Sequence, residues 1–493
     1  MACWRSPSGD WRSVPISTAI PGRTARLRLP ARPRAVLDLA LFGFLAGFFA
    51  IGLRRPFIWV LAYMYIDIVA PQKISWFLLA SVPISLIGFL AAFGGWVVAD
   101  NKEGTRFTFR QALMLILLVY CGYTTMVADF PEAAAAKWSW VWKSLVFAIF
   151  LPLTLRTRLR IEAAALVMVL SAGAIIIAGG IKTVFSGGGY GSLYFFVNDN
   201  TGLYEGSTLS MAAVAIIPLI IWLARFGTVF PPDWRVKLFA AALVFSCLLV
   251  PVGTQTRTGL LCIGVLAVIS LRAVKRRFLY LALMGAAGLL ALPFLPASYT
   301  QRMSTIENHE SDESASTRIA VWKWTLDYAK DNPMGGGFDS FLGNEIAYKT
   351  RKVDTTGSSS QVRYDKIVEK GRAFHSAYFE LLGEQGWPGL FLWLLLQGLG
   401  LIQLEFVRHR LLRSDDPLDR SNCALANALQ QGHIIYLVGA LFVGVAYQPF
   451  IFMLIALQIA LVQQVKRRQR PELPARRTQA QRTMKPVGVG EAG

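Results

Sequence analysis

The sequence predicts an all-α polytopic membrane protein with about 12 (12–13) transmembrane helices, and three observations support this fold class. Hydrophobic residues make up 54% of the 493 residues and charged residues only 16%, whereas soluble domains carry about 25% charged residues. Apolar runs recur along the chain at close to the ~20 residues that a helix needs to cross a bilayer. Short basic runs separate many of these segments, as expected where positive loops remain in the cytoplasm.

The net charge of +20 lies mainly at the ends of the chain and between the apolar segments. Residues 1–35 hold seven arginines and one aspartate, and residues 466–493 form a second basic segment. We expect the first segment to be disordered and the second to be a cytoplasmic tail, close to anionic membrane lipids. This positive-inside distribution argues against nucleic acid as a partner.

Thirteen apolar segments are candidate spans. The positive charge of the N-terminus indicates whether the number of true spans is odd or even. An even number of spans places the arginine-rich N-terminus and the basic tail together in the cytoplasm. Twelve spans result if residues 36–70, which Arg54-Arg55-Pro56 interrupts, form a re-entrant hairpin. The candidates are 36–53, 57–70, 75–98, 112–128, 139–155, 161–180, 207–225, 236–253, 258–273, 278–296, 386–404, 427–446 and 449–465.

The apolar segments form an N-terminal membrane region, 36–180, and a second membrane region, 181–465, which contains a polar loop over 297–385. The loop carries eleven Lys or Arg and thirteen Asp or Glu. Since long loops largely escape the charge rule, this balance suits a segment moved across the membrane. None of the five cysteines lies in the loop, so a disulfide framework is not expected there.

Local patterns predict some structure inside this loop. Apolar residues at helical spacing predict a short helix over 318–330, and Asn332-Pro333 with the following glycines would end it. Residues 343–373 are polar, and we expect them to be mobile. His375 then lies at the start of a helix that leads back into the membrane.

Histidine is scarce, and only His375 lies where the polar loop re-enters the membrane. An imidazole with an ordinary pKa near about 6.5 suits deprotonation of a hydroxyl at the membrane surface. The alternative is an interfacial polar residue that anchors the helix. The other histidines lie in an acidic stretch, a basic loop and a span: His309, His409 and His433.

Two arginines are candidate anion-binding residues. Arg257 interrupts the apolar sequence between two spans, where an ionisable residue is a functional candidate by default. Arg318 begins the predicted loop helix, and guanidinium groups bind phosphate oxygens in a bidentate manner. The alternatives are a snorkelling arginine at a helix end and an ordinary surface arginine. No closely spaced His/Cys set predicts a metal site, and glycines 187–189 lack the context of a nucleotide-binding loop.

Three stretches of the chain form a pattern when they are taken together: Thr256-Arg257-Thr258-Gly259; Thr317-Arg318 with Trp322 and Asn332–Gly337; and Phe374-His375-Ser376 with Glu380, Gly386 and Gly389. This set resembles the O-antigen ligase and polymerase superfamily. The order of the stretches agrees with that family, as does the position of the second stretch in a large extracytoplasmic loop. The first arginine motif more often reads Ser-Arg in the family. The resemblance covers about residues 36–465, and Leu37–Lys73 resembles the O-glycosylation ligases associated with the exosortase A system.

This resemblance implies a GT-C-like, inverting glycosyltransferase of the bacterial inner (plasma) membrane, with its catalytic loop in the periplasm and no metal ion or other cofactor. The donor would be a glycan on a polyprenyl diphosphate, typically undecaprenyl diphosphate. The acceptor would be a hydroxyl of a protein, lipid or polysaccharide. By match of motif, Arg257 and Arg318 would bind the diphosphate, and His375 would orient or deprotonate the acceptor hydroxyl.

Two other functions remain open from the sequence. A polymerase that joins repeat units on the same carrier would use the same residues, because only its acceptor differs. A transporter without chemistry is the third reading, but the chain has no internal repeat and few charges within its spans.

Overall fold

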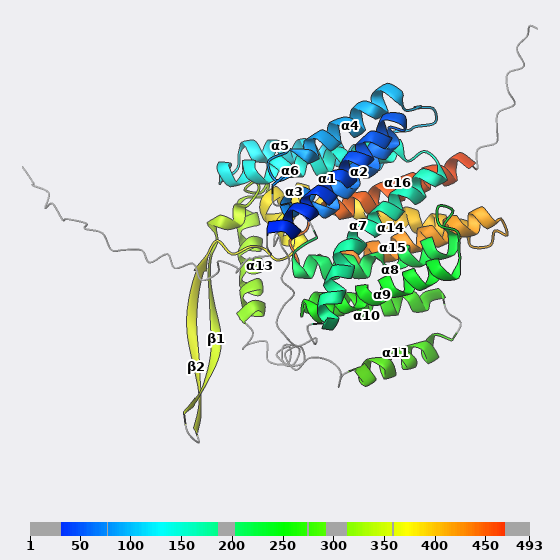
Figure 1. Cartoon of the computed structure of the whole chain (residues 1–493). Helices are drawn as coiled ribbons and strands as arrows, with labels where there is room; N and C mark the ends of the chain where they lie inside the picture. The colour runs from blue at the N-terminus through cyan, green and yellow to red at the C-terminus, as the bar shows by residue number, and fades with distance from the viewer. Residues whose placement is uncertain are drawn as a thin grey trace, which may run out of the picture.

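The computed structural model describes residues 31–75, 77–185, 203–273, 276–291, 313–356 and 359–468. These residues form a bundle of helices from which a β-hairpin projects (Figure 1). Most of the segment 1–35 and most of the tail 466–493, for which we expect disorder and a cytoplasmic location, lie outside the described residues.

The described elements follow the apolar segments of the sequence closely, and each of the predicted spans overlaps a helix. The first are α1 (Ala31–Arg54), α2 (Phe57–Val69), α3 (Pro71–Ile74), α4 (Ile84–Ala99), α5 (Phe109–Met126), α6 (Pro131–Thr154) and α7 (Arg158–Phe185). The middle ones are α8 (Gly206–Phe226), α9 (Trp234–Gly253), α10 (Arg257–Ser270), the 3-10 helix η1 (Leu271–Ala273) and α11 (Arg277–Ala291). The last are α13 (Glu313–Asp331), the 3-10 helix η4 (Ser340–Gly343), β1 (Glu345–Thr356), β2 (Ser359–Lys370), α14 (Ala377–Leu411), α15 (Pro417–Gly439) and α16 (Pro449–Arg468).

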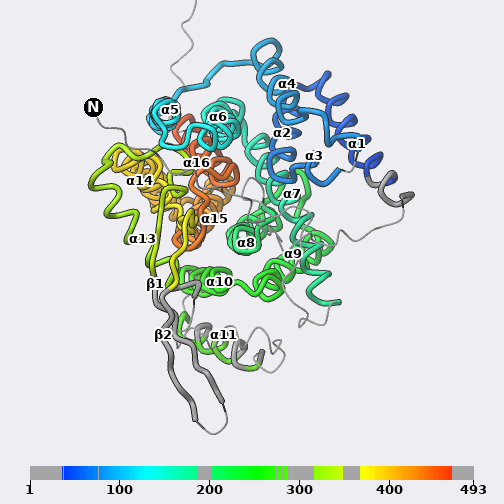
Figure 2. Tube along the Cα trace, turned by 90° about the vertical axis from the view of Figure 1, so that its left-hand side faces the viewer, coloured from blue at the N-terminus to red at the C-terminus, as the bar shows by residue number. Residues whose placement is uncertain are grey.

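Six helices within the described residues are long and apolar enough to cross a membrane: α5, α7, α8, α9, α14 and α16. Three more apolar helices, α2, α4 and α10, are shorter. Of the six, α8 and α16 are the most buried, and an end-on view places them inside the bundle with α1 and α4 at its edge (Figure 2). The predicted helical membrane fold is therefore confirmed in outline, while the number of twelve spans stays a prediction.

The β-hairpin is the main departure from the all-α prediction, and it replaces the mobile segment expected over 343–373. Strands β1 and β2 pair antiparallel, with Glu345 opposite Lys370. Both strands are rich in β-branched and aromatic residues, a signal for strands that their polar composition obscured. At the base of the hairpin, Ile346 packs against Val321 of α13 and against Phe374, which joins the hairpin to the helical part.

The glycine run after α13 holds the loop against a kink in α14. Helix α13 confirms the short helix predicted over 318–330. Beyond it, the Gly336 amide donates to the carbonyl of Gly383 at 3.0 Å, and the Gly337 amide donates to that of Glu384 at 2.9 Å. Helix α14 breaks at Gly386, whose φ is +61°. The glycines thus end one helix and also let two backbone segments approach each other closely.

The loops sort to two ends of the bundle, as the charge pattern predicts. At one end, Arg158 donates to the carbonyl of Phe226 at 3.1 Å, and Arg468 pairs with Asp416 at 2.6 Å. Helix α13 and the hairpin lie at the opposite end (Figure 1). The loops near Arg158 and Arg468 therefore lie at the end of the bundle away from the polar loop, and the identity of each compartment stays a prediction.

We expect Gly386→Ala to destabilise the protein, because an added Cβ would lie 2.2 Å from the carbonyl oxygen of Pro333 and the backbone has a positive φ. The loss should be roughly 1–3 kcal/mol. Thermal unfolding in detergent, followed with a thiol-reactive dye that reports exposure of the buried Cys121 and Cys262, measures this change.

The matched control is Gly398→Ala, on the same helix, where an added Cβ meets nothing within 4 Å. This change should leave the melting temperature unchanged or raise it, since alanine favours helix over glycine by about 0.5–1 kcal/mol. Equal melting temperatures for both variants would contradict the role assigned to the kink.

Candidate active site

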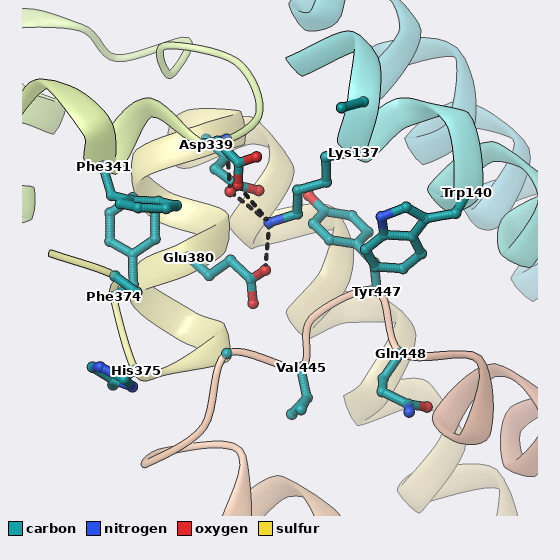
Figure 3. A pocket seen from close by; sticks show the side chains of 14 residues that line it. Lys137, Trp140, Asp339, Phe341, Phe374, His375, Glu380, Val445, Tyr447 and Gln448 are labelled. Atoms are coloured by element: carbon teal, nitrogen blue, oxygen red, sulfur yellow. Dashed lines mark hydrogen bonds and ion pairs between the residues drawn. The ribbon is translucent and has the colours of Figure 1, made fainter. Parts of the chain in front are cut away.

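A cavity of about 430 Å³ opens at the end of the bundle where α13 and the hairpin dock. Its walls come from α6, from the loop around η4, from the start of α14 and from the segment between α15 and α16. His375 lies at one edge of the cavity, and Lys137 and Trp140 lie across it (Figure 3). Residues that are far apart in the sequence therefore line one cavity beside His375, the histidine that the sequence analysis selected.

The backbone holds His375 in an unusual conformation directly before α14. Its φ is +49°, in the left-handed region that residues other than glycine rarely adopt. Trp322 of α13 donates from Nε1 to the carbonyl of Phe374 at 2.9 Å, and the Ala377 amide donates to the carbonyl of Ala440 at 2.9 Å. The residues on both sides of His375 are thus fixed by hydrogen bonds, which is how such strain persists at functional sites.

The surroundings of His375 favour the neutral form of its imidazole. Burial lowers the pKa of His375, and the positive charge of Arg318 lowers it further. Arg372 acts in the same direction, whereas the carboxylate of Glu205 opposes them. The neutral form is the one that can accept a proton from a hydroxyl.

Arg257 is the first residue of α10 and follows the turn that connects α9 to α10. Hydroxyl groups of this turn form hydrogen bonds with α8. The Oγ1 atoms of Thr254 and Thr256 lie 2.7 and 2.9 Å from Oγ of Ser210. Gly206, the neighbour of Glu205, also packs against this turn, since a Cβ there would lie 3.4 Å from Cβ of Thr254. The start of α8 therefore packs against the turn before Arg257, and the charge of Glu205 at the same place acts on His375.

The structure therefore brings Arg318 within electrostatic reach of His375 and places the Arg257 turn beside Glu205, which acts on the same histidine. Neither arginine is among the residues that line the cavity. His375 therefore borders a cavity that has no arginine among its lining residues, and Arg318 acts on it from outside that cavity.

Sequence reasoning missed the polar centre of the cavity. The Nζ atom of Lys137 lies 2.7 Å from Glu380, 2.7 Å from Glu384 and 3.6 Å from Asp339 (Figure 3). The Asp339 amide also donates to Oε1 of Glu384 at 3.0 Å. Burial raises the pKa of Asp339, and Lys137 opposes that rise. The sequence does hold one signal for this cluster, because Glu380 and Glu384 are spaced i and i+4 and so lie on one face of a helix. Their partner Lys137 is distant in the sequence, so the pairing could not be predicted.

Aromatic rings form much of the remaining wall of the cavity. Trp140 and Tyr447 lie on one side, and Phe341 and Phe374 on the other (Figure 3). Lys137 Nζ lies 5.7 Å from the centre of the Tyr447 ring, within the range of a cation–π contact. The cavity thus combines aromatic faces with a few charged groups, as small-molecule sites commonly do.

The two other histidines that the structure describes lie outside the cavity. His433 is buried in the bundle, with Nε2 2.7 Å from Oε1 of Gln397 and Nδ1 3.0 Å from Nε2 of Gln458. His409 is exposed beside Glu405. His309 lies outside the described residues.

No group of three or more His, Cys, Asp or Glu is placed to hold a metal ion in the part of the chain that the structure describes. In the cavity, the three carboxylates converge on the ammonium of Lys137. The predicted independence from metal ions stays a prediction.

Comparison with known protein families finds two matching segments. Residues 36–228 match a family of unknown function, DUF5935, and no curated protein matches the chain. Residues 241–394 match the O-Antigen ligase family, and this segment contains Arg257, Arg318 and His375. Residues 241–394 thus form an O-antigen ligase family domain, which supports the resemblance to the O-antigen ligase superfamily.

Proposed function

We propose that the protein transfers a glycan from a polyprenyl-diphosphate carrier, such as undecaprenyl diphosphate, to an acceptor hydroxyl. The observation that carries this proposal is the position of His375, a histidine at the edge of a cavity with Arg318 within electrostatic reach. The O-antigen ligase domain and the apolar helices support a membrane enzyme that acts on a lipid-linked glycan.

The chemistry follows from the roles of three residues. Neutral His375 accepts the proton of the acceptor hydroxyl while the acceptor oxygen bonds to the anomeric carbon of the donor sugar. The bond from that carbon to the phosphate oxygen breaks, and its electron pair leaves with the polyprenyl diphosphate. Arg257 and Arg318 stabilise the growing negative charge. Attack on the face opposite the leaving group inverts the anomeric carbon.

The proposal also includes the cellular setting. We place the enzyme in the bacterial inner membrane, with the catalytic region within residues 181–465 and the loop 297–385 in the periplasm, where lipid-linked donors are present. The resemblance of Leu37–Lys73 to exosortase-associated ligases favours a protein or polysaccharide acceptor over a lipid. Because of this resemblance to ligases, we prefer ligation of a preassembled glycan to polymerisation of repeat units.

A deletion strain complemented with His375→Ala, Arg257→Ala or Arg318→Ala tests the assignment. We expect transfer to fall at least ~100-fold in each variant, because each removes either the base or one stabiliser of the leaving charge. Full-length carrier-linked glycan should accumulate, as measured by lipid extraction and mass spectrometry.

His409→Ala and Arg235→Ala are matched controls, because both side chains are exposed and lie outside the cavity. Both should transfer at the wild-type rate. Full transfer by a stably expressed His375→Ala variant would refute the catalytic role of this histidine. A pool of single repeat units would identify a polymerase, and an unchanged pool would favour a transporter.

The rate should rise with pH through the pKa of His375 and then remain level. This pKa lies below the ordinary value of about 6.5 because burial and Arg318 disfavour the imidazolium. Since the neutral form is the active base, a lowered pKa moves the acid limb to lower pH. The pH profile of kcat/KM in isolated membranes measures the limb.

Two substitutions should move this limb in opposite directions. Glu205→Gln removes a charge that raises the pKa of His375, so the limb should shift to lower pH. Arg372→Gln removes a charge that lowers it, so the limb should shift to higher pH. A limb that stays at the same pH in both variants would show that another group titrates.

A further inference from the structure

We propose that the cavity beside His375 binds a sugar residue of the acceptor, which presents its hydroxyl to the imidazole. This inference rests on the proposed glycan transfer and extends it, because it assigns an acceptor class and a binding site to residues outside the family motifs. The residues that carry it are Lys137, Trp140, Asp339 and Glu384, all of which line the cavity.

The charge of the cavity suits a hydroxyl-rich ligand better than an anion. One ammonium faces three carboxylates, so acidic groups are in excess. A diphosphate placed here would meet like charges without an arginine among the lining residues. Carboxylate oxygens accept hydrogen bonds, and sugar hydroxyls are neutral donors that can supply them.

One carboxylate oxygen still needs a donor. Glu384 is fully buried, and its Oε1 receives Lys137 and the Asp339 amide. Its Oε2 has no hydrogen-bond partner among the described residues. A buried polar atom without a partner is costly, and a ligand hydroxyl in the cavity would remove that cost.

The aromatic rings supply the apolar part of the site. Trp140 is half-buried and points into the cavity, and Tyr447 lies beside it (Figure 3). A sugar ring has an apolar face of C–H groups that can pack against such rings, while its hydroxyls point outward to the carboxylates. The cavity volume of about 430 Å³ lies within the range of small-molecule sites.

The position of the cavity relative to the arginines favours the acceptor over the donor. Inversion requires the nucleophile and the leaving group to lie on opposite faces of the donor sugar. His375 borders the cavity, whereas Arg257 and Arg318 do not line it. An acceptor in the cavity would thus reach the base from the side away from the diphosphate.

Equilibrium dialysis of the full-length protein in detergent tests this assignment. One probe is a labelled neutral oligosaccharide released from the host's surface polysaccharide, and the other is inorganic pyrophosphate. Trp140→Leu and Asp339→Asn should each weaken oligosaccharide binding about tenfold or more and leave pyrophosphate binding unchanged. Arg318→Ala should weaken pyrophosphate binding and leave oligosaccharide binding unchanged.

Matched controls separate binding from folding. Trp142→Leu changes the same residue type on α6 outside the cavity lining, and Asp327→Asn changes an exposed aspartate on α13. Both should bind the oligosaccharide like the wild type. Asp339 has a φ of +57°, which asparagine also adopts, so Asp339→Asn preserves the backbone.

Unchanged oligosaccharide binding in both cavity variants would overturn the assignment, as would stronger competition from a lysine-rich peptide than from the sugar. In membranes that carry out transfer, Trp140→Leu should raise the KM for the acceptor. A rise in the KM for the carrier-linked donor alone would assign the cavity to the donor and also overturn the inference.

The two proposals fail in distinguishable ways. If His375→Ala abolishes transfer but the cavity variants bind the sugar normally, only the acceptor site is refuted. If His375→Ala transfers at the full rate, the proposed function is refuted regardless of what the cavity binds.

Discussion

The ammonium group of Lys137 is the interaction on which this end of the molecule depends. It neutralises Glu380 and Glu384 of α14 and reaches Asp339 at the start of η4. These carboxylates are largely buried, so removal of the lysine would leave negative charges without compensation, which typically costs about 3–5 kcal/mol for a buried pair. One side chain from α6 thereby holds together the helix that His375 precedes and the loop that covers it.

The backbone around this cluster is equally constrained. Gly336 and Gly337 donate hydrogen bonds to the carbonyls of α14 just before its kink, which brings Asp339 close to Glu384. Trp322 stacks on Phe379 in the first turn of α14, with ring centres 4.9 Å apart. The loop and α14 are therefore positioned by contacts that do not require any bound ligand, a form of preorganisation that suits catalysis.

The two motif arginines lie outside the cavity, whereas three carboxylates line it around Lys137. Arg318 of α13 lies within electrostatic reach of His375, and Arg257 begins α10, whereas the carboxylates face the cavity on the side of α6 and α14. The proposed transfer, which expels a diphosphate and binds a neutral acceptor, would benefit from this division, because each ligand would be repelled or poorly bound by the other region. His375 lies at the edge of the cavity, and desolvation and the charge of Arg318 lower its pKa.

The sequence by itself determined the helical membrane fold in outline, and it predicted Arg257, Arg318 and His375 as site residues. A helix in a membrane satisfies its backbone hydrogen bonds within its own segment, so apolar length is sufficient to locate it. The hairpin was obscured because pairing between β1 and β2 depends on partners across the strands, which polar composition does not reveal. The contacts of Lys137 with Asp339 and Glu384 depend on packing between segments more than two hundred residues apart. Only the tertiary structure decided this cluster, because an ion pair needs proximity in space and no local pattern encodes its partner.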